Sequence, residues 1–417
     1  MGPLSITAFV IIAAVKVIAV FTVIMITVAM LTLAERRIAA WIQDRSGPNR
    51  VGPWGILQPF ADGLKNLVKE ETMPAAASRG LFILAPMISM FPALVLFAVI
   101  PFGSPLPTRW GLVNLIIADL PIGFLYVLAL GSLGVYGIVL GGWASNSKYA
   151  LLGGLRASAQ MISYEVGLGL SLVPILMLTG NVALTEVVGL QQDMGLWFFF
   201  PLMLSYLIFA FSYFAETNRL PFDLPEAESE LVTGYHTEYS SMKFSMFFIA
   251  EYSNMLTASA LTVTFFFGGW DIPFWSGDNM RVLADGTVVG ASAAVWKSVL
   301  TMLVFAAKVG FFVFVFIWVR WTIPRFRYDQ VMALGWKVLI PVAVVYIAVL
   351  GAAMLLLEAR GFELGFLYGL VLTALNVLLV VAFLFVLDRG RIITGSWDPR
   401  RRARVRSRRL VPGARSG

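Results

Sequence analysis

The stretch TAFVIIAAVKVIAVFTVIMITVAMLTLA, residues 7–34, decides the fold class of this chain. It has 28 residues and a single charged side chain, that of Lys16. A helix needs roughly 20 apolar residues to cross about 30 Å of hydrocarbon, so this stretch is long enough to span a bilayer. It is too long for a signal peptide, and no small-residue cleavage site follows it. We therefore expect a membrane-spanning helix here and not a cleaved leader.

Composition extends this expectation to the whole chain. Of its 417 residues, 59% are hydrophobic and only 13% are charged, about half the charged share of a soluble domain. The predicted spans are residues 7–34, 81–101, 116–141, 157–179, 196–215, 244–268, 296–319, 337–357 and 364–387. We predict an all-α fold, a polytopic transmembrane helix bundle in residues 1–388 with about nine spanning helices.

The loops between these spans differ in their content of lysine and arginine. Residues 35–80 hold seven of these residues, whereas residues 180–195 hold none. Loops rich in positive charge stay in the cytoplasm. We therefore predict a multi-pass protein of a bacterial cell membrane, with its N-terminus outside and its C-terminus inside. The loops 35–80, 216–243 and 320–337 would then face the cytoplasm.

The C-terminal segment, residues 389–417, is strongly basic. It holds ten arginines and one acid, Asp398. A basic tail occurs in proteins that bind nucleic acid, but beside a membrane span it suits the anionic cytoplasmic lipid surface better. We predict a disordered cytoplasmic tail and no nucleic-acid partner.

One segment of residues 35–80 has the period of an amphipathic helix. Its apolar side chains recur at spacings of three and four and are those of Leu57, Phe60, Leu64, Leu67 and Val68. Polar residues such as Asp62 and Lys65 fill the other face, and Pro59 suits a first helical turn. The pattern predicts a helix in the plane of the membrane interface, or one packed on a partner protein.

Three charged residues fall inside predicted spans, namely Glu165, Glu251 and Lys308. A charge at the bilayer centre costs at least about 2.5–3.5 kcal/mol, so each needs a partner, a water or a proton. The simpler alternative is a protonated acid that only holds helices together. We favour functional acids, with Lys308 as a candidate partner.

Residues 216–238 concentrate acids on the face where the other loops are basic. One base, Arg219, accompanies six acids, which are Glu216, Asp223, Glu226, Glu228, Glu230 and Glu238. The segment also contains apolar residues such as Phe222 and Leu231, which argue against an ordinary solvated loop. Crowded carboxylates raise one another's pKa and titrate together. We interpret the segment as the entrance of a proton path.

The sequence offers no redox or metal site of its own. It has no cysteine and one histidine, His236, which excludes disulfides, iron–sulfur ligation and the usual multi-histidine zinc and haem sites. There is no phosphate-binding glycine motif after a strand. We assign no catalytic and no metal-binding residue. Any electron transfer must use a diffusible substrate or a cofactor on a partner.

Three long motifs, in the same order along the chain, carry a family resemblance. They are ERRIAAWIQDRSGPNR from residue 35, continuing to residue 70, AETNRLPFDLPEAESELVTG at residues 215–234, and PRFRYDQ at residues 324–330. They resemble the membrane subunit that contributes most of the quinone chamber of respiratory complex I, the proton-pumping NADH:quinone oxidoreductase. The resemblance covers residues 7–357, so span nine and the tail match only longer bacterial members.

The resemblance implies roles for particular residues. Those implied for quinone binding are Arg36, Phe60, Asp62 and Arg320. Those implied for the proton path are Glu165, Glu216, Asp223, Glu226, Glu228, Glu230, Glu238 and Glu251. The implied substrate is ubiquinone or menaquinone. The chain itself would bind no cofactor, because FMN and the iron–sulfur clusters belong to partner subunits of the complex.

Other functions remain open at this point. The same type of subunit serves related complexes fed by ferredoxin, F420 or hydrogen. A stand-alone proton-coupled transporter could use the intramembrane acids without partners, and would migrate alone or as a small oligomer on a native gel, whereas a subunit would migrate within a large assembly. An assembly scaffold is disfavoured, because it does not explain two acids at the bilayer centre.

Overall fold

The computed structural model describes residues 6–108, 111–224, 231–273, 275–282, 288–290, 292 and 294–390. Its main helices are α1 (Ile6–Ile42), α2 (Gln58–Val68), α3 (Arg79–Val95), α4 (Gly123–Ala144), α5 (Lys148–Thr179), α6 (Leu184–Met194), α7 (Met203–Glu216), α9 (Ser241–Phe266), α10 (Val295–Thr322), α11 (Tyr328–Leu334), α12 (Ile340–Ala359) and α13 (Phe366–Gly390). Two small antiparallel pairs are β1 (Leu106–Thr108) with β2 (Gly111–Val113), and β3 (Met280–Val282) with β4 (Val288–Gly290). Short 3-10 turns cover Pro53–Gly55, Leu96–Val99, Gly234–His236 and Ser276–Asp278, and a π-helix covers Gly335–Leu339.

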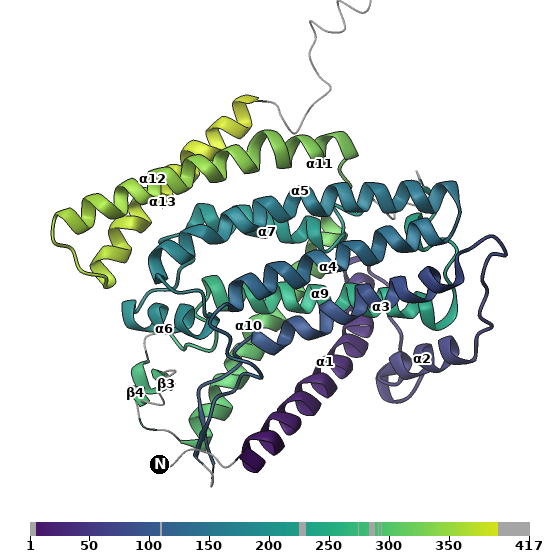
Figure 1. The fold of residues 1–417 in the computed structure, drawn as a ribbon, viewed down its shortest axis with the longest axis horizontal. Helices are drawn as coiled ribbons and strands as arrows, with labels where there is room; N and C mark the ends of the chain where they lie inside the picture. Colours follow the sequence, from purple (N-terminus) through teal and green to yellow (C-terminus); the bar gives the residue numbers. More distant parts are fainter. Residues whose placement is uncertain are drawn as a thin grey trace, which may run out of the picture.

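The helices form a bundle whose long members run side by side (Figure 1). In that view α2 lies at one end of the bundle, here called the α2 end, and α6 lies near the other, the α6 end. Among the described residues, seven helices are long and apolar enough to cross a membrane. They are Phe9–Ile42, Arg79–Val99, Gly123–Ala144, Lys148–Thr179, Val295–Thr322, Tyr328–Ala359 and Phe366–Phe385. They confirm the predicted all-α membrane bundle.

The predicted spans 196–215 and 244–268 correspond to α7 and α9, which are not among these seven helices. α7 has 14 residues, or about 21 Å of helix, which is shorter than the hydrocarbon core. The chain forms hydrogen-bonded turns before it, with Leu202 N donating to Phe198 O at 2.9 Å. α9 is long enough, but polar residues such as Ser253, Asn254 and Thr257 make its sequence less apolar.

Several helix ends differ from the predicted limits. α1 continues eight residues beyond the predicted end at residue 34, to Ile42, and α5 begins nine residues before residue 157, at Lys148. Conversely, α4 begins at Gly123 and not at residue 116. Hydropathy marks the part of a helix inside hydrocarbon, whereas the helix itself extends into the polar region. The extension of α1 carries Glu35 and Arg36, which line a large cavity.

Close helix packing fixes the centre of the bundle. An added Cβ at Gly137 of α4 would lie 2.2 Å from Ser89 Oγ and 2.8 Å from Ala85 O, both on α3. Only glycine therefore permits these two backbones to approach so closely. α3 in turn packs against α9, which carries the acid predicted in span six.

The loop after α7 is folded onto the α2 end of the bundle. Gln160 of α5 donates to Ala215 O and to Phe222 O, each at 2.8 Å. Phe222 is buried, and Phe326 N donates to Pro221 O at 3.2 Å. The loop between α7 and α9 and the loop after α10 are thereby joined beside the middle part of α5. The described part of the acidic segment is therefore a packed structure and not a free loop.

α2 is amphipathic, as predicted, and its apolar face is open. Phe60, Leu64 and Leu67 are each more than 60% exposed, although water disfavours such exposure of large apolar side chains. Ser241 Oγ of α9 donates to Asn66 O at 2.8 Å and thus attaches α2 to the bundle. This arrangement suits a helix whose apolar face enters the membrane interface.

Candidate functional site

A large cavity lies between α1, α2, α9 and α10 at the α2 end. Its volume is about 680 Å³. Along α1 the side chains that line it change from Met25 and Val28 to Glu35 and Arg36. The cavity therefore has an apolar end and a charged end, a combination that suits a ligand with an apolar tail and a polar head.

Three of the four residues predicted for the quinone site line this cavity. Arg36 Nη1 donates to Asp62 Oδ2 at 2.7 Å, and Arg320 approaches from the end of α10. Gln58 Nε2 also donates to Asp62, at 3.1 Å. The fourth residue, Phe60, is 62% exposed on the outer face of α2 and does not line the cavity.

Glu35 is the centre of the charged end of the cavity, and sequence reasoning gave it no role. Its side chain is buried and accepts hydrogen bonds from Arg219 Nη1 at 2.8 Å and from Tyr252 OH at 2.7 Å. Arg320 forms a second, short ion pair with the same carboxylate. A buried carboxylate needs such partners, since an unpaired charge in the interior is strongly destabilising. Its position at the start of the first motif was the only signal in the sequence.

Arg219 extends this network away from the cavity. Its Nε lies 2.5 Å from Glu251 Oε1, as an ion pair without the alignment of a hydrogen bond. Its guanidinium lies over the Tyr252 ring at 4.3 Å. The carboxylates of Glu35 and Glu251 raise the pKa of Arg219 despite its burial. Arg219, the one base of the acidic segment, is thus a buried and permanently charged residue that pairs with both Glu35 and Glu251.

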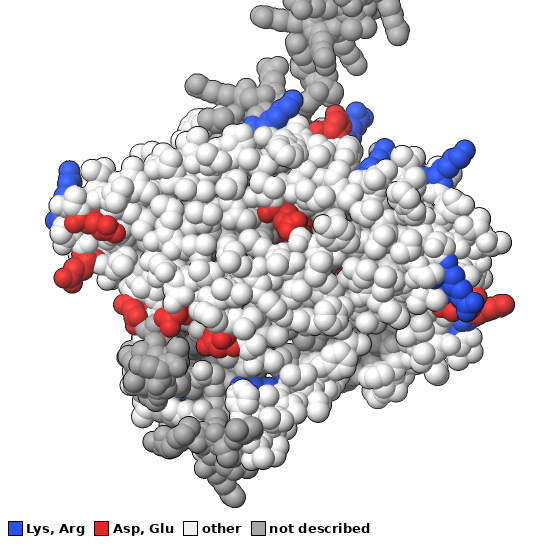
Figure 2. Space-filling model, in the orientation of Figure 1, with Lys and Arg blue, Asp and Glu red and all other residues white. Residues whose placement is uncertain are grey.

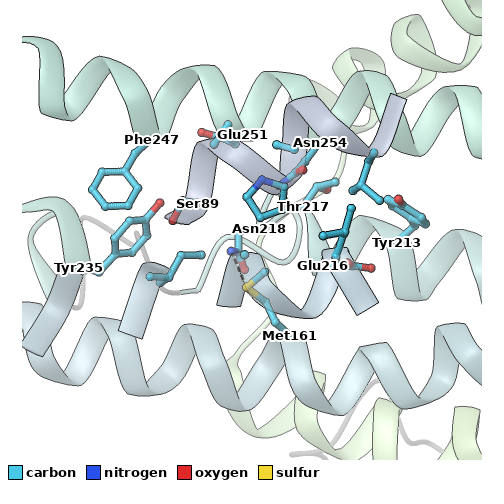
Figure 3. A pocket seen from close by; sticks show the side chains of 18 residues that line it. Ser89, Met161, Tyr213, Glu216, Thr217, Asn218, Tyr235, Phe247, Glu251 and Asn254 are labelled. Carbon is cyan, nitrogen blue, oxygen red and sulfur yellow. Dashed lines mark hydrogen bonds between the residues drawn. The ribbon is translucent and has the colours of Figure 1, made fainter. Parts of the chain in front are cut away.

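Glu251 borders a second, internal cavity (Figure 3). This internal cavity has a volume of about 50 Å³, enough for a few water molecules. Glu216, from the end of α7, lines it as well, and its Oε2 has no hydrogen-bond partner among the described residues. Figure 3 shows Thr217, Asn218 and Asn254 around the same space. The structure therefore brings two of the predicted proton-path acids to one cavity, whose lining is partly polar and partly apolar.

Glu165 lies next to this group but outside the internal cavity. It is half-buried on α5 and within electrostatic reach of Glu216. Figure 2 shows an acidic patch near the centre of one face of the molecule, surrounded by uncharged residues, while the other charged side chains on this face lie towards its edges. Glu165 is therefore placed where it can pass charge or a proton to a neighbour of the bundle.

The remaining acids occupy different environments. Asp223 accepts a hydrogen bond from Arg325 Nη2 at 3.1 Å. Burial raises the pKa of Asp223 to about 6, and the nearby charge of Arg325 opposes that rise. Glu238 is half-buried and lines neither of these two cavities. The predicted residues Glu226, Glu228 and Glu230 lie outside the described part of the chain.

Lys308 is not a partner of the intramembrane acids, contrary to our prediction. Its Nζ donates to the carbonyl oxygens of Phe267, Gly269 and Asp271 at 2.6–3.1 Å. It thus binds the end of α9 nearest α6, and it also faces the Trp197 ring at 4.4 Å. Three carbonyl oxygens satisfy all three ammonium donors, which explains why this lysine needs no carboxylate from the centre of the bundle.

Comparison with known proteins places this arrangement in a family. The sequence model of a family described as NADH dehydrogenase matches residues 15–351. An NADH-quinone oxidoreductase subunit of the H type from Geobacter metallireducens is 52% identical over 323 residues, which cover 78% of this chain and 90% of the relative. An H-type subunit from Cytophaga hutchinsonii is 49% identical over 323 residues, covering 78% and 91%. Another H-type subunit, from Geobacter sulfurreducens, is 51% identical over 318 residues, covering 76% and 89%. The chain therefore belongs to the family of H-type subunits of NADH-quinone oxidoreductases.

Proposed function

We propose that this chain, as a membrane subunit of NADH-quinone oxidoreductase, forms most of the quinone-binding chamber and the first proton path of the complex. The observation that carries the proposal is the pair of cavities joined by Glu35, Arg219 and Glu251. One cavity is large, amphipathic and lined by arginines. The other is small, has a mixed polar and apolar lining, and is bordered by two acids. Their connection places quinone chemistry and proton uptake within one network of charges.

The quinone headgroup would bind at the charged end of the large cavity. Reduction places negative charge on its two carbonyl oxygens, and cationic side chains stabilise charge that develops during a reaction. Arg36 and Arg320 line this end, so they are suited to that role. The apolar wall from Met25 and Val28 would accept the tail. Electrons would come from an iron–sulfur cluster on a soluble neighbouring subunit, supplied through FMN.

Protons would travel through the acids of the loop and the bundle. The proposed path contains Glu165, Glu216, Asp223, Glu226, Glu228, Glu230, Glu238 and Glu251. Proton transfer needs hydrogen-bond contact or one intervening water, and the internal cavity, which Glu216 and Glu251 both line, has room for water. In this proposal the α2 end, with its basic loops, faces the cytoplasm, and the N-terminus lies outside.

The quinone site is tested by replacing an arginine of the large cavity with methionine. Arg320→Met should lower kcat/KM for quinone by about 100-fold, since one lost donor to a developing anion typically costs that much. Ferricyanide reduction by the soluble arm should persist, because it does not use this cavity. The matched control is Arg37→Met, which removes an arginine that does not line this cavity. Unchanged quinone reductase activity in Arg320→Met and Arg36→Met would contradict the proposal.

A further inference from the structure

One guanidinium contacts two carboxylates that belong to different cavities. Arg219 Nη1 binds Glu35, which lines the large cavity, at 2.8 Å. Arg219 Nε lies 2.5 Å from Glu251, which lines the internal cavity. The Arg219 side chain is only 3% exposed, so solvent does not screen either interaction strongly. The cation is therefore shared between the two sites.

We propose that Arg219 transmits the charge of the reduced quinone to the proton path by shifting its contact from Glu251 towards Glu35. This inference rests on the proposed function, in which the large cavity holds quinone and Glu251 accepts protons. Arg219 is a positioning residue in this scheme, because it acts on quinone and proton only through its two carboxylates.

The first step takes place at Arg320. This residue lines the large cavity, is about one-third exposed and pairs with Glu35. An anionic headgroup in the cavity competes with Glu35 for Arg320. When Arg320 turns to the headgroup, the partners that Glu35 keeps among the described residues are the hydroxyl of Tyr252 and the guanidinium of Arg219. Its attraction for Arg219 therefore increases.

The second step takes place at Glu251. As Arg219 moves towards Glu35, Glu251 loses the contact that stabilises its ionised form. It remains near the charges of Asp223 and Glu35, which oppose its own negative charge, and Arg320 is now engaged elsewhere. A proton that comes from the acids of the loop and is relayed through water in the internal cavity then binds a Glu251 oxygen. When protonation converts the anionic reduced quinone to neutral quinol, Arg320 and Arg219 return, and Glu251 releases its proton towards Glu216.

The chemistry of arginine explains why this position holds it. The guanidinium is planar, remains charged and has five donors in a fixed fork, so it can contact two carboxylates at once. The Tyr252 ring at 4.3 Å supports its face and leaves the edges for the carboxylates. A lysine is a single point charge without this geometry, so it would hold one carboxylate permanently.

The experiment is redox-induced infrared difference spectroscopy on the intact complex. Reduction of the quinone should increase the absorption of protonated carboxyl groups, and Glu251→Gln should abolish the part that belongs to Glu251. In Arg219→Lys that part should be lost even though quinone is still reduced. Glu35→Gln should give the same loss, because Arg219 then stays with Glu251. The matched control is Arg156→Lys, since Arg156 lies over the Tyr328 ring at 5.6 Å and lines neither of the two cavities.

Each outcome decides a different claim. Loss of the Glu251 signal in both Arg219→Lys and Glu35→Gln, with retention in Arg156→Lys, supports the shared cation. A signal that persists in Glu35→Gln overturns it, whether or not Arg219→Lys assembles, and leaves the proposed proton path intact. A complex that shows no Glu251 signal even with its natural sequence overturns the role of Glu251 in the proposed function as well.

Discussion

Asp223 is an acid whose environment moves its titration towards neutral pH. Its pKa of about 6 reflects burial, which disfavours the carboxylate, against the stabilising charge of Arg325. The negative charge of Glu251 also raises this pKa. Asp223 can therefore exchange a proton with little change in free energy near neutral pH, as a proton path requires.

Removing the cation beside Asp223 should move its titration upwards. In Arg325→Gln the carboxylate loses its partner at 3.1 Å, so its pKa should rise above 6, by about one unit. The acid limb of the pH profile of quinone reduction should shift to higher pH by the same amount. Arg327→Gln is the control, because it removes a nearby arginine that forms no ion pair with Asp223 in the structure. Superimposable profiles for Arg325→Gln and the unchanged chain would show that Asp223 does not limit the reaction.

At this scale the sequence indicated residue types better than partners. It predicted that Glu251 needs a partner, and the structure supplies Arg219 rather than Lys308. The contacts of Glu35 join residues 184 and 285 positions apart, and no local period reports such pairs. The local pattern also could not show that Phe60 points away from the large cavity. An amphipathic pattern separates an apolar face from a polar face, but it does not say which of the two faces lines a cavity.

At the scale of elements, α13 stabilises the turns that precede the short helix α7 through a side-chain hydrogen bond. Asn376 of α13 is fully buried. Its Nδ2 donates to Pro201 O at 2.5 Å and its Oδ1 accepts from Tyr346 OH at 2.8 Å. Backbone groups in the turns before α7 would otherwise lack partners, which is costly at membrane depth. The ninth predicted span thus has a structural role, although hydropathy showed only its length.

Replacing Asn376 should therefore destabilise the bundle. Asn376→Leu leaves Pro201 O and Tyr346 OH without this partner, at about 1–3 kcal/mol for each buried group. The complex should release this chain at a lower temperature, as followed by native electrophoresis after heating. Thr373→Val is the control, because it removes only a bond within α13, to Gly369 O at 2.7 Å. Equal melting of both variants would mean that Asn376 adds nothing specific.

The prediction of elements succeeded where hydrophobic patterns are long. The amphipathic pattern located α2 almost to the residue, and the apolar runs located the bundle. Helix ends were less accurate, because α1 and α5 continue with polar residues beyond the hydrocarbon. The turns before α7 were not predicted. The apolar run there is long enough for a spanning helix, and its sequence does not show that Asn376 of α13 binds a backbone carbonyl of these turns.

At the scale of the whole molecule, the asymmetry of charge predicts one orientation. The basic loops lie at the α2 end. The last helix, α13, ends at Gly390, so a fusion after this residue reports the side on which the C-terminal segment lies. A reporter that is active only in the cytoplasm, fused after Gly390, should therefore be active. The same reporter inserted between residues 180 and 195 should be silent. The reverse pattern would mean that the orientation, and with it the direction of the proposed proton path, is wrong.

The whole complex also provides the test of coupling. The two intramembrane acids lie on different helices, Glu251 at the internal cavity and Glu165 towards the outer face. If they only hold helices together as protonated acids, glutamine should replace them with little effect, since it keeps a similar shape and can form hydrogen bonds. If they carry protons, Glu165→Gln and Glu251→Gln should each assemble but translocate fewer protons per NADH in reconstituted vesicles. Quinone reduction should slow as well, because a tightly coupled complex cannot turn over without its protons.

Glu186→Gln is the control, because Glu186 lies on α6 and lines neither cavity. Natural pumping in the Glu165→Gln/Glu251→Gln double variant would show that protons reach the other side without these acids, and the two cavities would then serve quinone binding alone.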